Sequence, residues 1–132
     1  MALEWLARGA AKDPVVYPFE MELATPRIID TRPLIRGIAE DIRRQTDGAI
    51  VARRFHATIA EMIDAVCREL RSDCGLSRVV LSGGVFMNAL LTTMAAQRLQ
   101  DDGFSVYCHC RVPANDGGLC LGQLAVAASA LE

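Results

Sequence analysis

Apolar side chains recur every three or four residues along two stretches of the chain, a spacing that places them on one face of an α-helix. The first stretch follows Pro33, which suits the first turn of a helix, and Asp30 or Thr31 can cap it. The second runs over about residues 49–71 and is the longest in the chain. Gly75 comes soon after it and tolerates the left-handed conformation that commonly ends a helix. The pattern therefore predicts two consecutive amphipathic helices.

The pattern changes after Gly75. A short β-branched run at residues 78–81 is followed by a glycine turn, an amphipathic stretch over about 85–100 and a second strand-like run near 104–107. This order predicts a βαβ unit, with its two strands parallel or close together in one sheet. A last helix, over about 116–130, is rich in small residues, which would let it pack closely on its neighbours.

The first thirty residues differ from the rest because prolines interrupt short apolar pieces there. Pro14, Pro18 and Pro26 favour extended segments and turns over helix, with one or two short strands. The sequence thus predicts a single α/β domain over residues 1–132. It consists of an extended or irregular lead-in at 1–29 and a helical and βαβ part at 30–132.

The composition is that of an ordinary globular protein, with 52% hydrophobic residues and a formal net charge of −2. This near-neutral charge argues against broad electrostatic binding to nucleic acid or to an anionic membrane. We find neither an apolar run of membrane-spanning length nor a signal-peptide pattern, so we expect a cytoplasmic protein. The five cysteines are odd in number and irregularly spaced, which favours reduced thiols over a disulfide framework.

The turn Ser82-Gly83-Gly84 is the first candidate for chemistry, because it follows a strand and precedes a helix. Its glycines would let a ligand approach the backbone, and the helix behind it would offer unpaired N–H groups to a phosphate. In a parallel sheet, the loop after the second strand reaches the same edge. That loop carries Asp116, so we expect Asp116 to lie near the glycine turn.

Each of these features also has a purely structural interpretation. A glycine pair after a strand is often a tight turn, and an aspartate before a helix is often its cap. Asn88 is either a solvated residue in the first turn of a helix or a ligand contact, whereas His56 is better explained as a packed or surface histidine than as a catalytic base. The cluster Cys108-His109-Cys110 lacks a second ligand pair at zinc-site spacing.

Several joined motifs resemble one known family. They are VVLSGGVFMN (residues 79–88), RVPANDGG (111–118) and LGQ (121–123), with DTRPL (30–34) and ARRFH (52–56) upstream. In this order they resemble the C-terminal end of the HypF family, the carbamoyltransferases of [NiFe]-hydrogenase maturation. The resemblance covers most of the chain and weakens before about Ile28.

The resemblance implies the C-terminal half of an actin-like ATPase (ASKHA) domain with a βαβ core and long flanking helices. The family uses ATP and carbamoyl phosphate, through a carbamoyl-adenylate, to carbamoylate the C-terminal cysteine of HypE. The resemblance implies no catalytic residue in this chain. It implies a divalent metal at Asp116, either magnesium or of the iron or zinc type, shared with the preceding half of the domain. It also implies contacts with ATP or carbamoyl-adenylate at six residues, namely Ser82, Gly83, Gly84, Asn88, Gly117 and Gly118.

The family's paired-histidine metal motif belongs to a preceding part of the domain, and this sequence has no matching His-x-x-x-His. We therefore expect part of an active site, inactive alone, whose partners are the preceding portion of the enzyme and a HypE-like acceptor protein. An alternative is a non-catalytic nucleotide-binding or protein-interaction module, with the exposed half-interface forming a homodimer. A third is a thiol or metal sensor at Cys108, His109 and Cys110.

Overall fold

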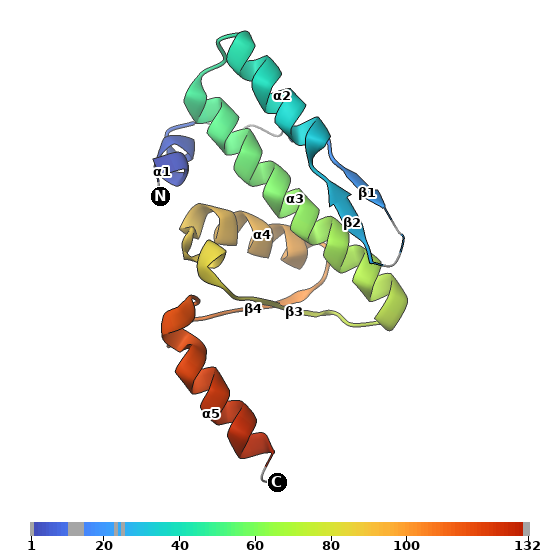
Figure 1. Ribbon diagram of the computed structural model, residues 1–132, viewed down its shortest axis with the longest axis vertical. Helices are drawn as coiled ribbons and strands as arrows, with labels where there is room; N and C mark the ends of the chain where they lie inside the picture. The colour runs from blue at the N-terminus through green and yellow to red at the C-terminus, as the bar shows by residue number, and fades with distance from the viewer. Residues whose placement is uncertain (1, 11–14, 23, 25, 131–132) are drawn as a thin grey trace.

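The computed structural model describes residues 2–10, 15–22, 24 and 26–130. Its elements follow in the order α1 (Ala2–Arg8), β1 (Glu20–Glu22), β2 (Ile28–Asp30), α2 (Arg32–Arg43), α3 (Gly48–Cys74), β3 (Arg78–Leu81), η1 (Gly84–Met87), α4 (Ala89–Asp101), β4 (Ser105–Cys108), η2 (Asp116–Gly118) and α5 (Leu119–Ser129), where η marks a 3-10 helix (Figure 1). The strands form two separate pairs, β1 with β2 and β3 with β4. The α/β class predicted from the sequence is confirmed.

The two amphipathic helices are confirmed as α2 and α3. Pro33 lies in the first turn of α2, and Asp30 Oδ1 accepts a hydrogen bond of 2.9 Å from the Arg32 backbone N–H, whereas the Thr31 side chain makes no capping bond. At the start of α3, Asp47 Oδ1 accepts a hydrogen bond of 2.8 Å from the Ala49 N–H. Gly75 ends α3 with a φ of 70°. Local capping chemistry therefore sets the start of both helices and the end of α3.

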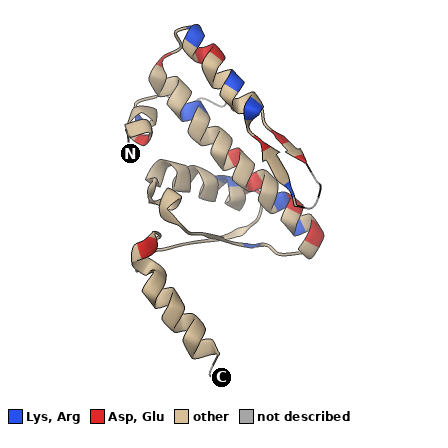
Figure 2. Ribbon diagram, in the orientation of Figure 1, with Lys and Arg blue, Asp and Glu red and all other residues tan. Residues whose placement is uncertain are grey.

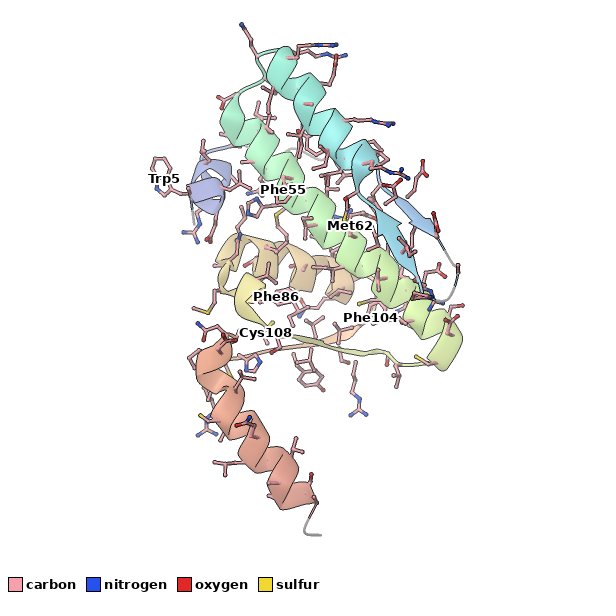
Figure 3. All side chains as sticks on the ribbon, in the orientation of Figure 1. Trp5, Phe55, Met62, Phe86, Phe104 and Cys108 are labelled. Carbon is pink, nitrogen blue, oxygen red and sulfur yellow. The ribbon has the colours of Figure 1, made fainter. Side chains whose placement is uncertain are left out.

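The βαβ unit is also confirmed, because β3 and β4 pair in parallel with Leu81 opposite Cys108. The helix expected over residues 85–100 is divided, however. Asn88 has extended backbone angles (φ −75°, ψ 100°), so the short η1 ends there and α4 begins. Phe86 and Phe104 lie in the layer between α4 and the β3–β4 pair (Figure 3). The buried residues of this core are Ala60, Leu81, Leu91, Ala95, Leu99 and Phe104.

The lead-in differs in part from the expected extended structure. Its short strands β1 and β2 are present and antiparallel, but residues 2–8 form the helix α1. The prolines that argued against helix begin only at Pro14, which lies outside the described residues, so they do not restrict this segment. Ala7 of α1 is fully buried, and Glu4 Oε1 accepts hydrogen bonds from Arg8 and from the Leu90 backbone N–H. Packing against the rest of the domain thus stabilises a helix too short to be stable alone.

A buried polar cluster joins the lead-in to α2 and α3. Tyr17 is 5% exposed, its hydroxyl donates to Asp41 Oδ2 at 2.7 Å, and its backbone N–H donates to Thr58 Oγ1 at 2.8 Å. Arg54 Nη1 donates to the same Asp41 oxygen at 2.8 Å. The hydrogen bond from Tyr17 lowers the pKa of Asp41 against the opposing effect of burial, and the Arg54 guanidinium adds to this effect.

The last helix does not pack as its small residues predict. None of the residues of α5 is buried, and the helix runs away from the β3–β4 pair, on the opposite side from α3 and α4 (Figure 1). Figure 2 shows charged residues along α2 and α3 and none on α5. Small side chains allow a close neighbour but do not identify it, and no described element buries a residue of α5. None of the described helices is both long and apolar enough to span a membrane.

Replacing Tyr17 with phenylalanine should lower the free energy of unfolding by about 1 to 3 kcal/mol, because it removes a hydrogen bond to a charged carboxylate. Urea denaturation followed by circular dichroism measures the change. Tyr107→Phe is the matched control, since Tyr107 is 54% exposed, and its stability should equal that of the wild type. Equal stability of the two variants would contradict a stabilising role for the cluster.

The lowered pKa of Asp41 also predicts a dependence of stability on pH. A carboxyl group with a native pKa below its usual 3.8 stabilises the fold fully above about pH 4, and this contribution is lost as the pH falls through the native pKa. Asp41→Asn should therefore be less stable than the wild type at pH 7, and the difference should narrow below pH 4. Denaturation curves at several pH values measure it, and a constant difference would rule out this contribution.

Candidate functional site

The candidate site begins where β3 and β4 end. Because Leu81 lies opposite Cys108 in the parallel pair, the next residue of each chain segment, Ser82 and His109, reaches the same edge. The Ser82 hydroxyl and His109 Nε2 are 2.8 Å apart, a hydrogen-bond distance. Both side chains are exposed.

The two glycines of the turn differ in what the fold requires. The backbone conformation requires glycine at Gly83 but not at Gly84. Gly83 has a φ of 100°, which side-chain-bearing residues rarely adopt, and its N–H donates to Ala114 O at 2.8 Å. This bond fastens the turn to the loop after β4. Gly84 lacks a positive φ, and a Cβ added there would meet no atom within 4 Å. The structural interpretation therefore accounts for Gly83 but not for Gly84.

In the loop after β4, Asn115 acts as the cap in place of Asp116. Asn115 Oδ1 accepts a hydrogen bond of 3.1 Å from the Gly117 N–H. A Cβ on Gly118 would lie 2.6 Å from Pro113 O, so the loop needs glycine at that position. The Asp116 carboxylate is exposed, and no side chain of the described residues pairs with it. The expected capping role of Asp116 is thus wrong, and its carboxylate is available to a ligand.

These segments line one pocket of about 650 Å³. Four of the residues expected to bind a nucleotide or metal lie in it, namely Ser82, Gly83, Asp116 and Gly118. Three do not belong to its lining, namely Gly84, Asn88 and Gly117. The predicted approach of Asp116 to the glycine turn is confirmed, whereas binding by any of the seven residues stays a prediction.

Asn88 caps α4 instead of lying as a solvated residue in its first turn, and its contact with a ligand stays a prediction. Its Oδ1 accepts from the Leu91 N–H at 3.0 Å, and its Nδ2 lies 2.8 Å from His56 Nε2. His56 Nδ1 lies 2.8 Å from Ala52 O. A carbonyl oxygen can only accept, so His56 donates from Nδ1 and accepts at Nε2, which makes it neutral. His56 is 2% exposed, so its interpretation as a packed histidine is confirmed.

Comparison with known proteins identifies the family. Residues 1–123 match the family model described as "Carbamoyltransferase, Kae1-like Domain, second subdomain". The chain belongs to the HypF carbamoyltransferase family. It is similar to Carbamoyltransferase HypF of Rhodobacter capsulatus, with 40% identity over 79% of this chain and 13% of that protein. It is also similar to Carbamoyltransferase HypF of Synechocystis, with 31% identity over 82% of this chain and 13% of that protein.

Two solved HypF structures share the fold. The crystal structure of full-length HypF in the phosphate- and nucleotide-bound form superposes with a TM-score of 0.91 at 33% identity, over 98% of this chain and 17% of that one. The structure of T. kodakarensis HypF gives a TM-score of 0.81 at 27% identity, over 99% of this chain and 16% of that one. The chain therefore spans about one seventh of the HypF proteins that it resembles.

The sequence interpretation missed His109 as part of this HypF pocket, having weighed it only as a metal ligand beside Cys108 and Cys110. The signal was the parallel pairing itself, which brings the residues after the two strands together. No group of three or more His, Cys, Asp or Glu that could hold a metal is found in the described part of the chain. Cys108 and Cys110 are exposed thiols.

The single carboxylate of Asp116 fits a divalent metal that takes its other ligands elsewhere. Magnesium is commonly bound through one or two carboxylates together with substrate phosphates and waters. An exposed, unpaired carboxylate in a pocket with room for a nucleotide's phosphates meets that requirement. The residues present therefore fit a metal held jointly by Asp116 and a phosphate group.

Gly84→Ala tests whether a ligand reaches Gly84. The added methyl group meets open space, so unfolding free energy should change by less than about 0.5 kcal/mol, whereas a ligand lying against the backbone would be displaced. ATP affinity in a HypF enzyme that carries this chain as its matching segment should fall. Gly48→Ala, at the start of α3 and 3.9 Å from Leu6 Cδ2, is the control and should leave affinity unchanged. Unaltered affinity in both variants would remove Gly84 from the site.

Proposed function

We propose that this chain supplies one wall of a nucleotide site in a HypF-type carbamoyltransferase. The observation that carries the proposal is the pocket that Ser82 and Gly83 of the turn after β3 line together with the unpaired Asp116. A turn with a bare backbone suits phosphate groups, and a carboxylate across from it suits their counter-cation. A HypF structure at 33% identity is described as phosphate- and nucleotide-bound, which supports this ligand class.

In this proposal the ligand is ATP or a carbamoyl-adenylate, and the chain binds and orients it. The turn at Ser82, Gly83 and Gly84, with Gly117 and Gly118, receives the phosphates, and Asn88 contributes the amide hydrogen that His56 does not use. A divalent cation, when bound at Asp116, neutralises phosphate charge. The whole enzyme passes the carbamoyl group to the C-terminal cysteine of a HypE-like protein during hydrogenase maturation. The domain has the actin-like ATPase architecture and works in the cytoplasm.

The proposed principal partner of this chain is the rest of a HypF enzyme. The sheet carries α3 and α4 on one face, while on the other Val80 and its cross-strand neighbour Tyr107 are 66% and 54% exposed. The helix α5 also exposes apolar side chains. The exposed large apolar residues of β3, β4 and α5 are Val80, Tyr107, Leu119, Leu121, Leu124 and Val126. An uncharged surface of this kind marks an interface. A homodimer through the same surface is the alternative.

The competing function is a non-catalytic nucleotide-binding or protein-interaction module derived from the family. The exposed apolar surface supports this module as well, because the same surface could dock another protein. The two functions differ at Asp116, which a docking module does not need.

Calorimetric titration with ATP and magnesium separates them. The chain alone should bind weakly, and binding should strengthen when the remaining portion of a HypF enzyme is added. In that mixture Asp116→Asn should weaken binding about tenfold or more, or ~1.4 kcal/mol, while thermal stability is retained because Asn115 and not Asp116 caps the loop. Tight binding by the chain alone would contradict the one-wall proposal. Equal binding by Asp116→Asn and the wild type would favour the interaction module.

A further inference from the structure

We infer that His109 is a positioning residue that turns the Ser82 hydroxyl toward a bound phosphate group. The inference rests on the proposed function, because it assigns a role within the same pocket. Its basis is the contact of 2.8 Å between Ser82 Oγ and His109 Nε2 at the edge of the β3–β4 pair. Both side chains line the pocket, and neither is buried in a core that would explain the contact as packing.

The charges of the pocket lining favour an anion at this contact. His109 is the one lining side chain that can become a cation, and Asp116 is the one that carries a negative charge. A phosphate group is repelled by the Asp116 carboxylate unless a cation lies between them. The remaining lining is glycine, apolar residues and uncharged amides, so His109 and Ser82 form the electrostatically favourable end.

The direction of the hydrogen bond follows from the ligand's charge. If His109 accepted a hydrogen bond from the Ser82 hydroxyl, Ser82 Oγ would present only lone pairs to the phosphate. Those lone pairs would repel the negatively charged phosphate oxygens. If Nε2–H donates to Oγ, the Ser82 O–H is left to donate to the phosphate. An anion therefore selects the form of His109 protonated at Nε2. The imidazole Nδ1 has no partner among the described side chains, so that form meets no conflict there.

The opposite direction would make Ser82 a nucleophile with His109 as its base. Such a pair is normally completed by a third group that holds the imidazole through its other nitrogen. No described residue holds Nδ1 of His109, which favours the positioning role over the nucleophilic one.

The test uses the HypF-type enzyme that contains this chain, with ATP and magnesium as the probe and affinity measured by calorimetry. His109→Leu should weaken binding about tenfold, or ~1.4 kcal/mol. His109→Gln should recover most of this loss, since its amide N–H can replace Nε2–H. Ser82→Ala should weaken binding similarly, and the double variant Ser82→Ala with His109→Leu should be no weaker than Ser82→Ala alone, because one residue acts through the other. Cys110→Ser, outside the pocket lining, is the control and should bind as the wild type does.

Each of the following outcomes would overturn the inference. Additive losses in the double variant, or no recovery with glutamine, would show that His109 does not act through Ser82. Unchanged affinity in all these variants while Asp116→Asn still weakens binding would reject this inference and leave the proposed function standing. Unchanged affinity in Asp116→Asn as well would reject the proposed function itself. A Ser82→Ala enzyme that binds normally but loses turnover would assign the nucleophilic role instead, and thermal unfolding of each variant excludes a folding defect.

Discussion

The parallel pairing of β3 with β4 is the constraint on which the site depends. Its register sets Leu81 opposite Cys108, so the next residues, Ser82 and His109, meet at hydrogen-bond distance. The Gly83 N–H bond to Ala114 then fastens the turn after β3 to the loop after β4. That loop carries Asp116, and a shift in the register would move its carboxylate away from the turn. The pairing of the backbone therefore sets the position of the pocket, and the side chains determine what lines it.

A second set of bonds fixes where α4 begins. Asn88 joins the Leu91 N–H to His56, which is held by Ala52 O within α3. The start of α4 is thus tied to the first third of the longest helix through the half-buried Asn88 and the buried His56. Such a chain is costly to break because it would leave buried groups unsatisfied. It holds the segment between Gly83 and α4 in one position relative to the core.

The sequence predicts the order of elements well, because each depends on local rules. The stripe of apolar residues and the glycine at position 75 mark α3, and the β-branched run marks β3 within the observed bounds. It could not predict α1, since tertiary contacts stabilise a segment that has no strong local signal. The sequence also could not distinguish the two glycines of the turn. Gly83 has a positive φ that favours glycine, whereas Gly84 does not. His109 was overlooked because its importance comes from the strand opposite, which lies 27 residues away in sequence.

The sequence of β3 also bears on the uncovered face of the β3–β4 pair. Parallel strands normally have both faces buried, and such strands are continuous runs of apolar residues rather than alternating ones. The run Val79-Val80-Leu81 has this character, yet Val80 is 66% exposed while Leu81 is 3% exposed. The sequence of β3 is thus that of a strand with a layer on each side, whereas the described residues form only one of these layers. The uncharged α5 beside this face has the composition of a second buried surface. Under the proposal that this chain supplies one wall of a nucleotide site, a layer covering Val80 and α5 would meet the chain at the edge where the pocket lies.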